Sequence, residues 1–305
     1  MPSSNQIPVI WHEGSLDGDK RSHYGNTGLL NEMFDATVSY EFIHGSTFRE
    51  LPTGSTGAIV VVHGGHEAGR ESEILGDVNT LSWSVIIIFG DEEGTFNTRL
   101  LQAPNRKLWQ QTPIPGKHDF CDRFLICGYP CDTQRELRKL EGTLKDTDWF
   151  FSGQISHSRR HLCAHFMQNV PNGDFNRTVG FNQGFDRAEY FQRMARAKIV
   201  PCPAGPATPD TIRLAEALES GCIPIADDVP GTRTSYPLSY WRYVLKQEPP
   251  FPVLTDWADA PNIVAREVAA FPEKTLKLQA WWIEYKRNMQ DWLRSDIKEL
   301  KAKCE

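Results

Sequence analysis

Residues 198–225 read KIVPCPAGPATPDTIRLAEALESGCIPI, and this stretch decides the fold class. A short apolar run leads into a loop rich in proline and glycine, then into a helix-like segment, and then into a second apolar run. This succession predicts a strand, a loop, a helix and a second strand, which together form the repeating unit of an α/β sheet. Because the loop ends where the helix begins, the segment also predicts a place for an anion such as a phosphate.

Two charged side chains stand at the start of that helix. Arg213 and Glu216 are three residues apart and share one face of the helix, so one could meet a phosphate and the other a hydroxyl group. Each feature also has a plainer structural explanation. The two side chains could form an ordinary ion pair, Asp210 or Thr211 could be the N-cap, and Gly221 could be a C-cap glycine. Taken singly, each residue fits its structural explanation, whereas the combination at this spacing is harder to explain in that way.

Composition sets the broad class. A length of 305 residues allows two domains, with 40% apolar and 24% charged residues as in ordinary globular proteins. A net charge of -6 argues against a nucleic-acid partner. No apolar run reaches the roughly 20 residues that a membrane span needs, and no signal peptide is recognised. Seven scattered cysteines favour reduced thiols, so we expect a cytoplasmic protein without a metal site.

Apolar runs along the chain predict two successive α/β arrays. In the first half, strands are expected at 7–11, 38–43, 58–62, 85–89 and 124–127. In the second half, strands are expected at 149–152, 178–181, 199–202 and 222–226, with helices at 158–170, 187–197 and 211–220. A long helical pattern then covers 275–303, with a strongly aromatic stripe.

We therefore expect an N-terminal Rossmann-like domain over 1–131, a linker over 132–148 and a second domain over 149–273. The helix at 274–305 is expected to pack back on the first domain. The two domains would face each other across a cleft. One doubly wound domain with insertions is the alternative.

Several polar clusters follow predicted strands, where ligands gather in α/β sheets. His63 and His66 flank a glycine pair after one strand, and Asp91 and Glu92 follow another. A further strand at 149–152 leads into a loop that contains Gly153 and then into a helix that opens with Arg159 and Arg160, a pattern suited to a diphosphate. Solvated arginines at an ordinary turn are the alternative.

Other catalytic motifs are missing from the sequence. His161 and His165 are four residues apart, but Leu162 stands where a zinc protease has its glutamate, so we interpret the pair as structural. Neither a GxSxG elbow nor a phosphate-binding P-loop is present, which lowers the case for a hydrolase or an NTPase.

Two segments, FFSGQISHSRRHL at 150–162 and YFQRMARAKIVPCPAGPATPDTIRLAEALESGCIPI at 190–225, resemble the exostosin-like glycosyltransferases, glycosyltransferase family 47. The matching positions are Phe151, Gly153, Arg160, Met194, Lys198, Pro203, Gly205, Arg213, Glu216, Ala217, Gly221, Cys222, Ile223 and Pro224. Thr211 stands where the family usually has serine. The first half of the chain matches only in its expected architecture.

This resemblance implies a GT-B fold and an inverting, metal-independent transfer from a nucleotide-sugar, usually a UDP-sugar, to a glycan or another hydroxyl acceptor, as in polysaccharide biosynthesis. It implies no cofactor beyond the donor. Arg213 and Arg160 would meet the diphosphate and Glu216 the ribose. The full set of candidate donor-binding residues is Gly153, Arg159, Arg160, Pro203, Gly205, Thr211, Arg213 and Glu216.

The catalytic base is expected from the N-terminal domain. The candidates are Asp91 and Glu92, ranked first, followed by His63 and His66; the acids could equally cap a helix. Two other functions remain open. One is a non-catalytic nucleotide- or carbohydrate-binding module, and the other is a UDP-sugar epimerase of the same fold.

Overall fold

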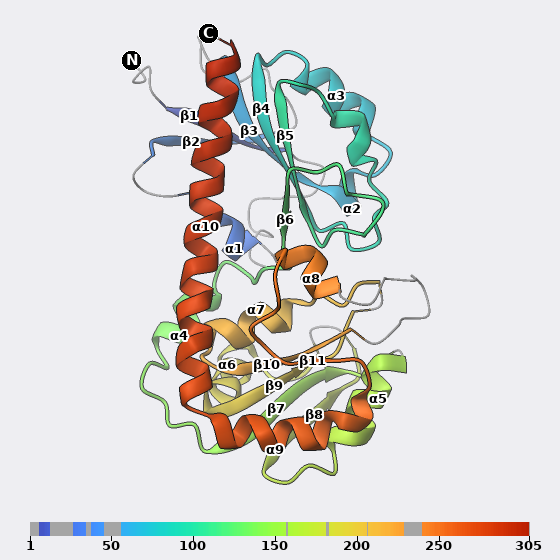
Figure 1. The fold of residues 1–305 in the computed structure, drawn as a ribbon, viewed down its shortest axis with the longest axis vertical. Coiled ribbons are helices and arrows are strands. Elements are labelled where there is room, and N and C mark those ends of the chain that lie inside the picture. Colours follow the sequence, from blue (N-terminus) through green and yellow to red (C-terminus); the bar gives the residue numbers. More distant parts are fainter. Residues whose placement is uncertain are drawn as a thin grey trace. The chain divides into compact units, whose positions relative to one another are not determined.

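The computed structural model describes residues 6–12, 27–34, 38–45, 56–156, 158–180, 183–205, 207–228 and 240–304, apart from the side chains of His44, Ser158 and Arg159. The chain forms two compact units (Figure 1). Unit 1 comprises Met1–Ile126 and Lys286–Glu305, and unit 2 comprises Cys127–Tyr285. No helix in the described ranges is long and apolar enough to cross a membrane.

Unit 1 contains a six-stranded sheet in the order β2-β1-β3-β4-β5-β6, and every neighbouring pair is parallel. The strands are β1 Ile7–His12, β2 Tyr40–Gly45, β3 Gly57–His63, β4 Trp83–Phe89, β5 Arg106–Gln111 and β6 Arg123–Leu125. The central strands β3 and β4 carry unbroken β-branched runs that are buried throughout, as strands covered on both faces require.

Short helices cover part of this sheet. They are α1 Thr27–Asn31, α2 Gly64–Glu67, α3 Glu71–Val78 and the 3-10 helix η3 Thr98–Leu101. On α3, Ile74 and Val78 pack with alternate residues of β3, including Val60 and Val62, in one buried apolar cluster. The alternation places the remaining β3 side chains on the opposite face of the sheet.

The long helix α10, Glu273–Cys304, supplies the last part of unit 1. Trp109 on β5 donates its indole N–H to Asp296 Oδ2 at 2.9 Å, across 187 residues of sequence. Lys107, also on β5, pairs with Glu299, also on α10, at 3.0 Å. The segment of α10 from residue 286 onward therefore packs on the sheet of unit 1.

Unit 2 contains a five-stranded parallel sheet in the order β11-β10-β9-β7-β8. The strands are β7 Thr147–Gln154, β8 Gly173–Thr178, β9 Ala197–Cys202, β10 Ile223–Asp227 and β11 Val253–Leu254. The helices are α4 Thr133–Arg138, α5 Ser158–Met167, α6 Arg187–Arg196, α7 Ile212–Glu219, α8 Tyr240–Leu245, the 3-10 helix η4 Trp257–Asp259 and α9 Ala260–Ala270. Helix α6 contacts β7 and β9, α7 contacts β9 and β10, and α4 contacts both helices, whereas α5 packs with α9 (Figure 1).

The two parallel sheets confirm the α/β class and a Rossmann-like arrangement in each half. In each sheet the second strand along the chain lies outside the first, and the following strands extend the sheet in the other direction. The strand order therefore reverses beside the first strand, between β1 and β3 in unit 1 and between β7 and β9 in unit 2. Ligands of open α/β sheets bind at the carboxyl ends of strands at this reversal.

The structure differs from the sequence predictions in three places. The strand expected at 178–181 is in fact β8, which ends at Thr178; residue 181 lies outside the described part. The stretch expected to be a linker, 132–148, contains helix α4 and the start of β7. Strand β5 was not predicted, because its sequence RKLWQQ is polar although most of it is buried.

Candidate functional site

The strand reversal in unit 2 brings the end of β7 close to the start of α7. Thr211, with extended φ and ψ of -144° and 150°, is the N-cap residue of α7, and Arg213 follows in the first turn. The Arg213 guanidinium lies over the Phe151 ring, 4.6 Å from its centroid. Its Nη2 also donates to the Ser152 carbonyl oxygen at 2.8 Å. A cation is thus held near the end of β7, at the place where ligands bind in such sheets.

Gly153 makes room for this cation. A β-carbon added to Gly153 would lie 2.7 Å from Arg213 Nη2, closer than such contacts occur in proteins. The backbone of Gly153 lies outside the left-handed region, so space and not conformation is the reason for glycine here. The structure therefore indicates that Gly153 leaves the space in which the Arg213 guanidinium lies.

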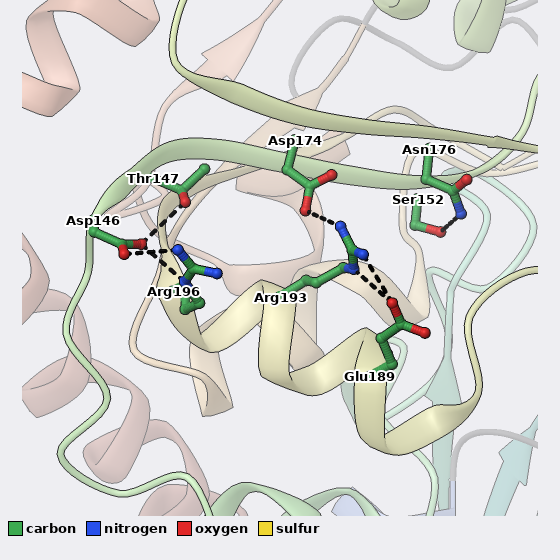
Figure 2. A network of polar contacts seen from close by, with 8 residues as sticks. All are labelled: Asp146, Thr147, Ser152, Asp174, Asn176, Glu189, Arg193 and Arg196. Atoms are coloured by element: carbon green, nitrogen blue, oxygen red, sulfur yellow. Dashed lines mark hydrogen bonds and ion pairs between the residues drawn. The ribbon is translucent and has the colours of Figure 1, made fainter.

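The end of β7 is itself fixed by its neighbour β8. Ser152 Oγ accepts a hydrogen bond from Asn176 Nδ2 at 3.0 Å, and Figure 2 shows these two side chains pointing toward each other. The same view shows Arg193 of α6 between Asp174 and Glu189, with N–O distances of 2.9 Å and 2.8 Å. Partly exposed ion pairs of this kind add little stability, but they align α6 with the sheet.

Glu216 lies one turn after Arg213 and is 6% exposed. Its Oε2 accepts a hydrogen bond from the Tyr190 hydroxyl at 2.9 Å, which joins α7 to α6. Burial raises the pKa of Glu216, while the Tyr190 hydrogen bond and the nearby Arg187 and Arg213 cations act to lower it. The cost of burying the Glu216 carboxylate is thus only partly offset by its hydrogen bond and the two cations.

The loop after β9 is held by two buried acids. Asp227, at the end of β10, accepts from the Ala204 backbone N–H at 3.1 Å and from the Trp257 indole at 2.9 Å. Asp210, just before α7, accepts from the Cys127 backbone N–H at 2.6 Å. Pro203 and Gly205 flank Ala204 in this loop, and both are buried. Sequence reasoning missed the role of Asp227; its position at a strand end is the signal that could have identified it.

Among the described residues, two buried polar atoms at the start of α7 are left without a hydrogen bond. Thr211 Oγ1 and Arg213 Nε are buried, and within the described ranges neither has a hydrogen-bond partner. Thr211 is 9% exposed and makes no capping bond with its side chain. Unpaired buried donors carry a free-energy cost unless a ligand or water satisfies them. Together with the helix N-terminus, they form a site suited to an anion.

Arg160 belongs to the same neighbourhood. Burial raises the pKa of the Cys163 thiol on α5 well above its usual value, and Arg213 and Arg160 both oppose this rise, as nearby cations do. Both arginines therefore lie within electrostatic range of one buried thiol. The side chain of Arg159, predicted beside Arg160, lies outside the described residues.

A separate polar hollow of about 370 Å³ lies at the carboxyl ends of β3 and β4 in unit 1. Its walls comprise His63, Gly65, His66, Gly90, Asp91, Glu92, Glu93 and Thr95. All four residues predicted as candidate bases thus line a single depression. The Gly65 N–H donates to the Gly90 carbonyl at 3.3 Å, which joins the two loops that form it.

The two histidines of the hollow differ in their surroundings. His63 Nδ1 accepts from the His66 backbone N–H at 3.3 Å, so a neutral His63 carries its proton on Nε2. Burial and the neighbouring His66 lower the pKa of His63 to about 4. His63 is therefore neutral near pH 7, with its proton on Nε2. His66 is exposed, and its ring meets that of His63 edge to face at 4.2 Å.

The two acids of the hollow also differ. Asp91 is 1% exposed, and its Oδ1 accepts from the Thr95 backbone N–H at 2.7 Å and from the Thr95 hydroxyl at 3.1 Å. The Phe96 backbone N–H lies 3.3 Å from both oxygens of the same carboxylate. Burial raises the pKa of Asp91, and these hydrogen bonds oppose the rise. Asp91 thus organises the loop after β4, whereas Glu92 is half-buried and lines the hollow.

The described residues contain no group of three or more His, Cys, Asp or Glu side chains placed to hold an ion. His161 and His165 are both exposed on α5.

Comparison with known proteins places the C-terminal part of the chain near one family. The family model described as RXYLT1 C-terminal domain matches residues 182–300, which is less than half of the chain. Ribitol-5-phosphate xylosyltransferase 1 from Danio rerio is 28% identical over 109 residues, which cover 34% of this chain and 25% of the relative. The match to this curated relative therefore spans about a quarter of its length.

The family model covers α6, α7 and their surroundings, with Tyr190, Arg213 and Glu216, but begins after Gly153 and Arg160. Over this region the chain is similar to a glycosyltransferase-related family. The more specific resemblance to exostosin-like enzymes stays a prediction.

Proposed function

We propose that this chain is a glycosyltransferase that binds a nucleotide-sugar through unit 2. The observation that carries the proposal is the position of Arg213 at the strand reversal, where its guanidinium lies over Phe151 and bonds the Ser152 carbonyl. The buried Glu216 follows one turn farther along α7. A cation and an acceptor at this spacing suit a diphosphate and a ribose. The similarity to a protein named as a xylosyltransferase supports the same class of reaction.

In this proposal the diphosphate lies at the start of α7. Arg213, the Thr211 hydroxyl and the helix N-terminus receive it, and Arg160 adds positive charge, with Arg159 beside it in the sequence. Gly153 secures Arg213, while Pro203 and Gly205 let the loop backbone approach the donor. Glu216 accepts hydrogen bonds from the ribose. We take the donor to be a UDP-sugar, and UDP-xylose is the first donor to test because of the relative's name.

The proposed chemistry is an inverting displacement at the anomeric carbon. The acceptor hydroxyl loses its proton as its oxygen attacks, and the nucleoside diphosphate leaves with the electrons of the broken bond. Preorganised cations and a helix N-terminus stabilise the charge that develops on the leaving group. We propose that the arginines and α7 perform this role without a metal ion.

The groups of the unit 1 hollow are the candidates for taking up the acceptor proton. We favour His66 and Glu92, because they line the hollow without the buried loop contacts of Asp91. His63 is less suited, since its Nδ1 already accepts the His66 N–H. The acceptor would be a glycan or another hydroxyl compound.

Calorimetry with UDP tests donor binding. We expect saturable binding to the wild type and at least tenfold weaker binding to Arg213→Ala and Glu216→Gln. Arg242→Ala is the matched control, because Arg242 lies on α8 in the same unit and pairs with Glu248 at an exposed position. Unchanged UDP affinity in both test variants would contradict the proposal.

A product assay with UDP-sugars and a panel of hydroxyl acceptors then tests the reaction. Transfer that is lost in His66→Ala or Glu92→Gln supports a glycosyltransferase. Donor binding without turnover would instead indicate a binding module. Conversion of the donor sugar without any acceptor would indicate an epimerase.

A further inference from the structure

The side chain of Tyr190 is held firmly on α6. Its ring contacts Phe150 on β7 edge to face, with centroids 5.6 Å apart, and Phe191 at 5.3 Å. With the ring fixed on two sides, its hydroxyl reaches α7 and lies 2.9 Å from Glu216 Oε2. The contact joins residues that are 26 apart in sequence, so the helical spacing that pointed to Glu216 could not reveal it.

The direction of this hydrogen bond is settled by chemistry. Burial raises the pKa of Tyr190 well above its usual value, and the neighbouring Glu216 raises it further. The phenol therefore keeps its proton and donates, and the carboxylate accepts. One carboxylate oxygen of Glu216 is thereby fixed by the protein, which sets the plane and orientation in which the other oxygen can accept.

We propose that Tyr190 is a positioning residue that orients Glu216 toward the ribose hydroxyls and so makes the site prefer ribonucleotides to deoxyribonucleotides. The inference rests on the proposed function, because it requires a nucleotide at this site. Tyr190 itself need not touch the donor. It acts by holding an acceptor that would otherwise rotate or turn away.

The preference for ribonucleotides over deoxyribonucleotides follows from the burial of Glu216. A ribonucleotide satisfies the buried acceptor with its hydroxyl groups, whereas a 2′-deoxy analogue leaves part of it unpaired. A site built to bond a hydroxyl rejects the analogue that lacks it, because a buried polar group then loses its partner. The effect is largest when the acceptor cannot rotate to another partner, and Tyr190 supplies this restriction.

The affinities of UDP and 2′-deoxy-UDP, measured by calorimetry, test the inference. We expect the wild type to prefer UDP by about tenfold and Tyr190→Phe to reduce this preference to about threefold or less. Tyr243→Phe is the matched control, since it removes the same hydroxyl from another half-buried tyrosine of unit 2 and should leave the ratio unchanged. A wild-type ratio in Tyr190→Phe would overturn the inference.

The pH dependence of this ratio separates positioning from a general loss of structure. The groups that act electrostatically on Glu216, or on which it acts, are Tyr190, Arg187, Arg213, Asp132 and Cys202. The Tyr190 hydrogen bond lowers the pKa of Glu216, so Tyr190→Phe should raise it. As pH falls, the variant should lose its remaining preference for UDP at a higher pH than the wild type.

Equal weakening of both nucleotides at every pH would show a merely structural role and overturn the inference. If the wild type binds neither nucleotide, the proposed function fails and the inference with it. If the wild type binds and discriminates but Tyr190→Phe does so equally well, the inference alone fails.

Discussion

Gly153 and Arg213 form one structural unit, because a β-carbon on Gly153 would lie 2.7 Å from Arg213 Nη2. The missing side chain lets the guanidinium lie across the end of β7, where it bonds the Ser152 carbonyl and covers the Phe151 ring. The contact joins a strand end to a helix start that are 60 residues apart in sequence.

Gly153→Ala should therefore displace the Arg213 guanidinium and weaken UDP binding by about tenfold or more, as measured by calorimetry. The fold should survive, because the new β-carbon would meet the far end of a flexible side chain. Gly76→Ala on α3 is the control and should leave UDP affinity unchanged, because a β-carbon there meets nothing within 4 Å. Alanine is also more stable than glycine inside a helix, by about 0.5–1 kcal/mol. Wild-type UDP affinity in Gly153→Ala would show that this position of Arg213 is not the binding one.

Arg213→Lys separates charge from geometry. Lysine keeps the positive charge, but its compact ammonium cannot lie flat on Phe151 and also present a planar fork. We expect UDP affinity to fall by about tenfold, while Arg242→Lys at the exposed site on α8 leaves it unchanged. Equal affinity of Arg213→Lys and the wild type would mean that a point charge is sufficient.

Local sequence patterns predicted the central strands, because β4 and β9 contain the apolar runs 85–89 and 199–202, which a parallel sheet buries on both faces. They could not predict β5, whose buried Gln110 is satisfied by Thr98 and whose Trp109 is satisfied by Asp296. Such partners are fixed by the tertiary fold and leave no local periodicity.

The candidate site shows the same division. Helical spacing was enough to select Arg213 and Glu216, which share one face of α7. The bonds from Tyr190 to Glu216 and from Ala204 to Asp227 join separate elements, so no spacing rule identified them. Predicted catalytic roles for His63, His66, Asp91 and Glu92 stay predictions, although the fold gathers all four around one hollow.

Glu216→Gln should stabilise the fold at neutral pH while it weakens nucleotide binding. Burial raises the folded-state pKa of Glu216 above its unfolded value of about 4.3. As the pH rises from the unfolded-state pKa to the folded-state pKa, the unfolded chain loses its proton first, so the fold becomes less stable. Glutamine removes this cost and still accepts from Tyr190. The melting temperature should rise at pH 7, and the gain should shrink toward pH 4. No change is expected for Glu248→Gln, whose side chain is 71% exposed; a lower melting temperature for Glu216→Gln at pH 7 would contradict the argument.

His63 should make the folded state less stable as the pH falls. Its folded-state pKa is about 4, below the unfolded value of about 6.5, so the unfolded chain binds a proton first and stability is lost between these values. His63→Gln should flatten this part of the stability curve, measured by urea unfolding from pH 7 to pH 4. His118→Gln should flatten the curve in the same way, because the pKa of His118 is also lowered to about 4 by burial and its Nδ1 also accepts a backbone N–H. Only His63→Gln alters the hollow. An unchanged slope in His63→Gln would contradict the role of His63 in this loss of stability.

Asp296 is expected to be the strongest single polar contact between α10 and the sheet of unit 1. It is 2% exposed, accepts the Trp109 indole N–H at 2.9 Å and lies 3.2 Å from Arg123 Nη2. Asp296→Ala leaves the buried indole N–H unpaired and should lower the free energy of unfolding by about 1–3 kcal/mol, as measured by chemical denaturation. Asp296→Asn keeps an acceptor for the indole and should cost less.

Asp291→Ala removes an exposed partner of Arg294 on the same helix and should change stability by at most about 1 kcal/mol, because exposed ion pairs are weak. If Asp296→Ala and Asp291→Ala have equal effects, the indole bond does not hold α10 in place, and apolar packing by residues such as Leu293 must do so instead.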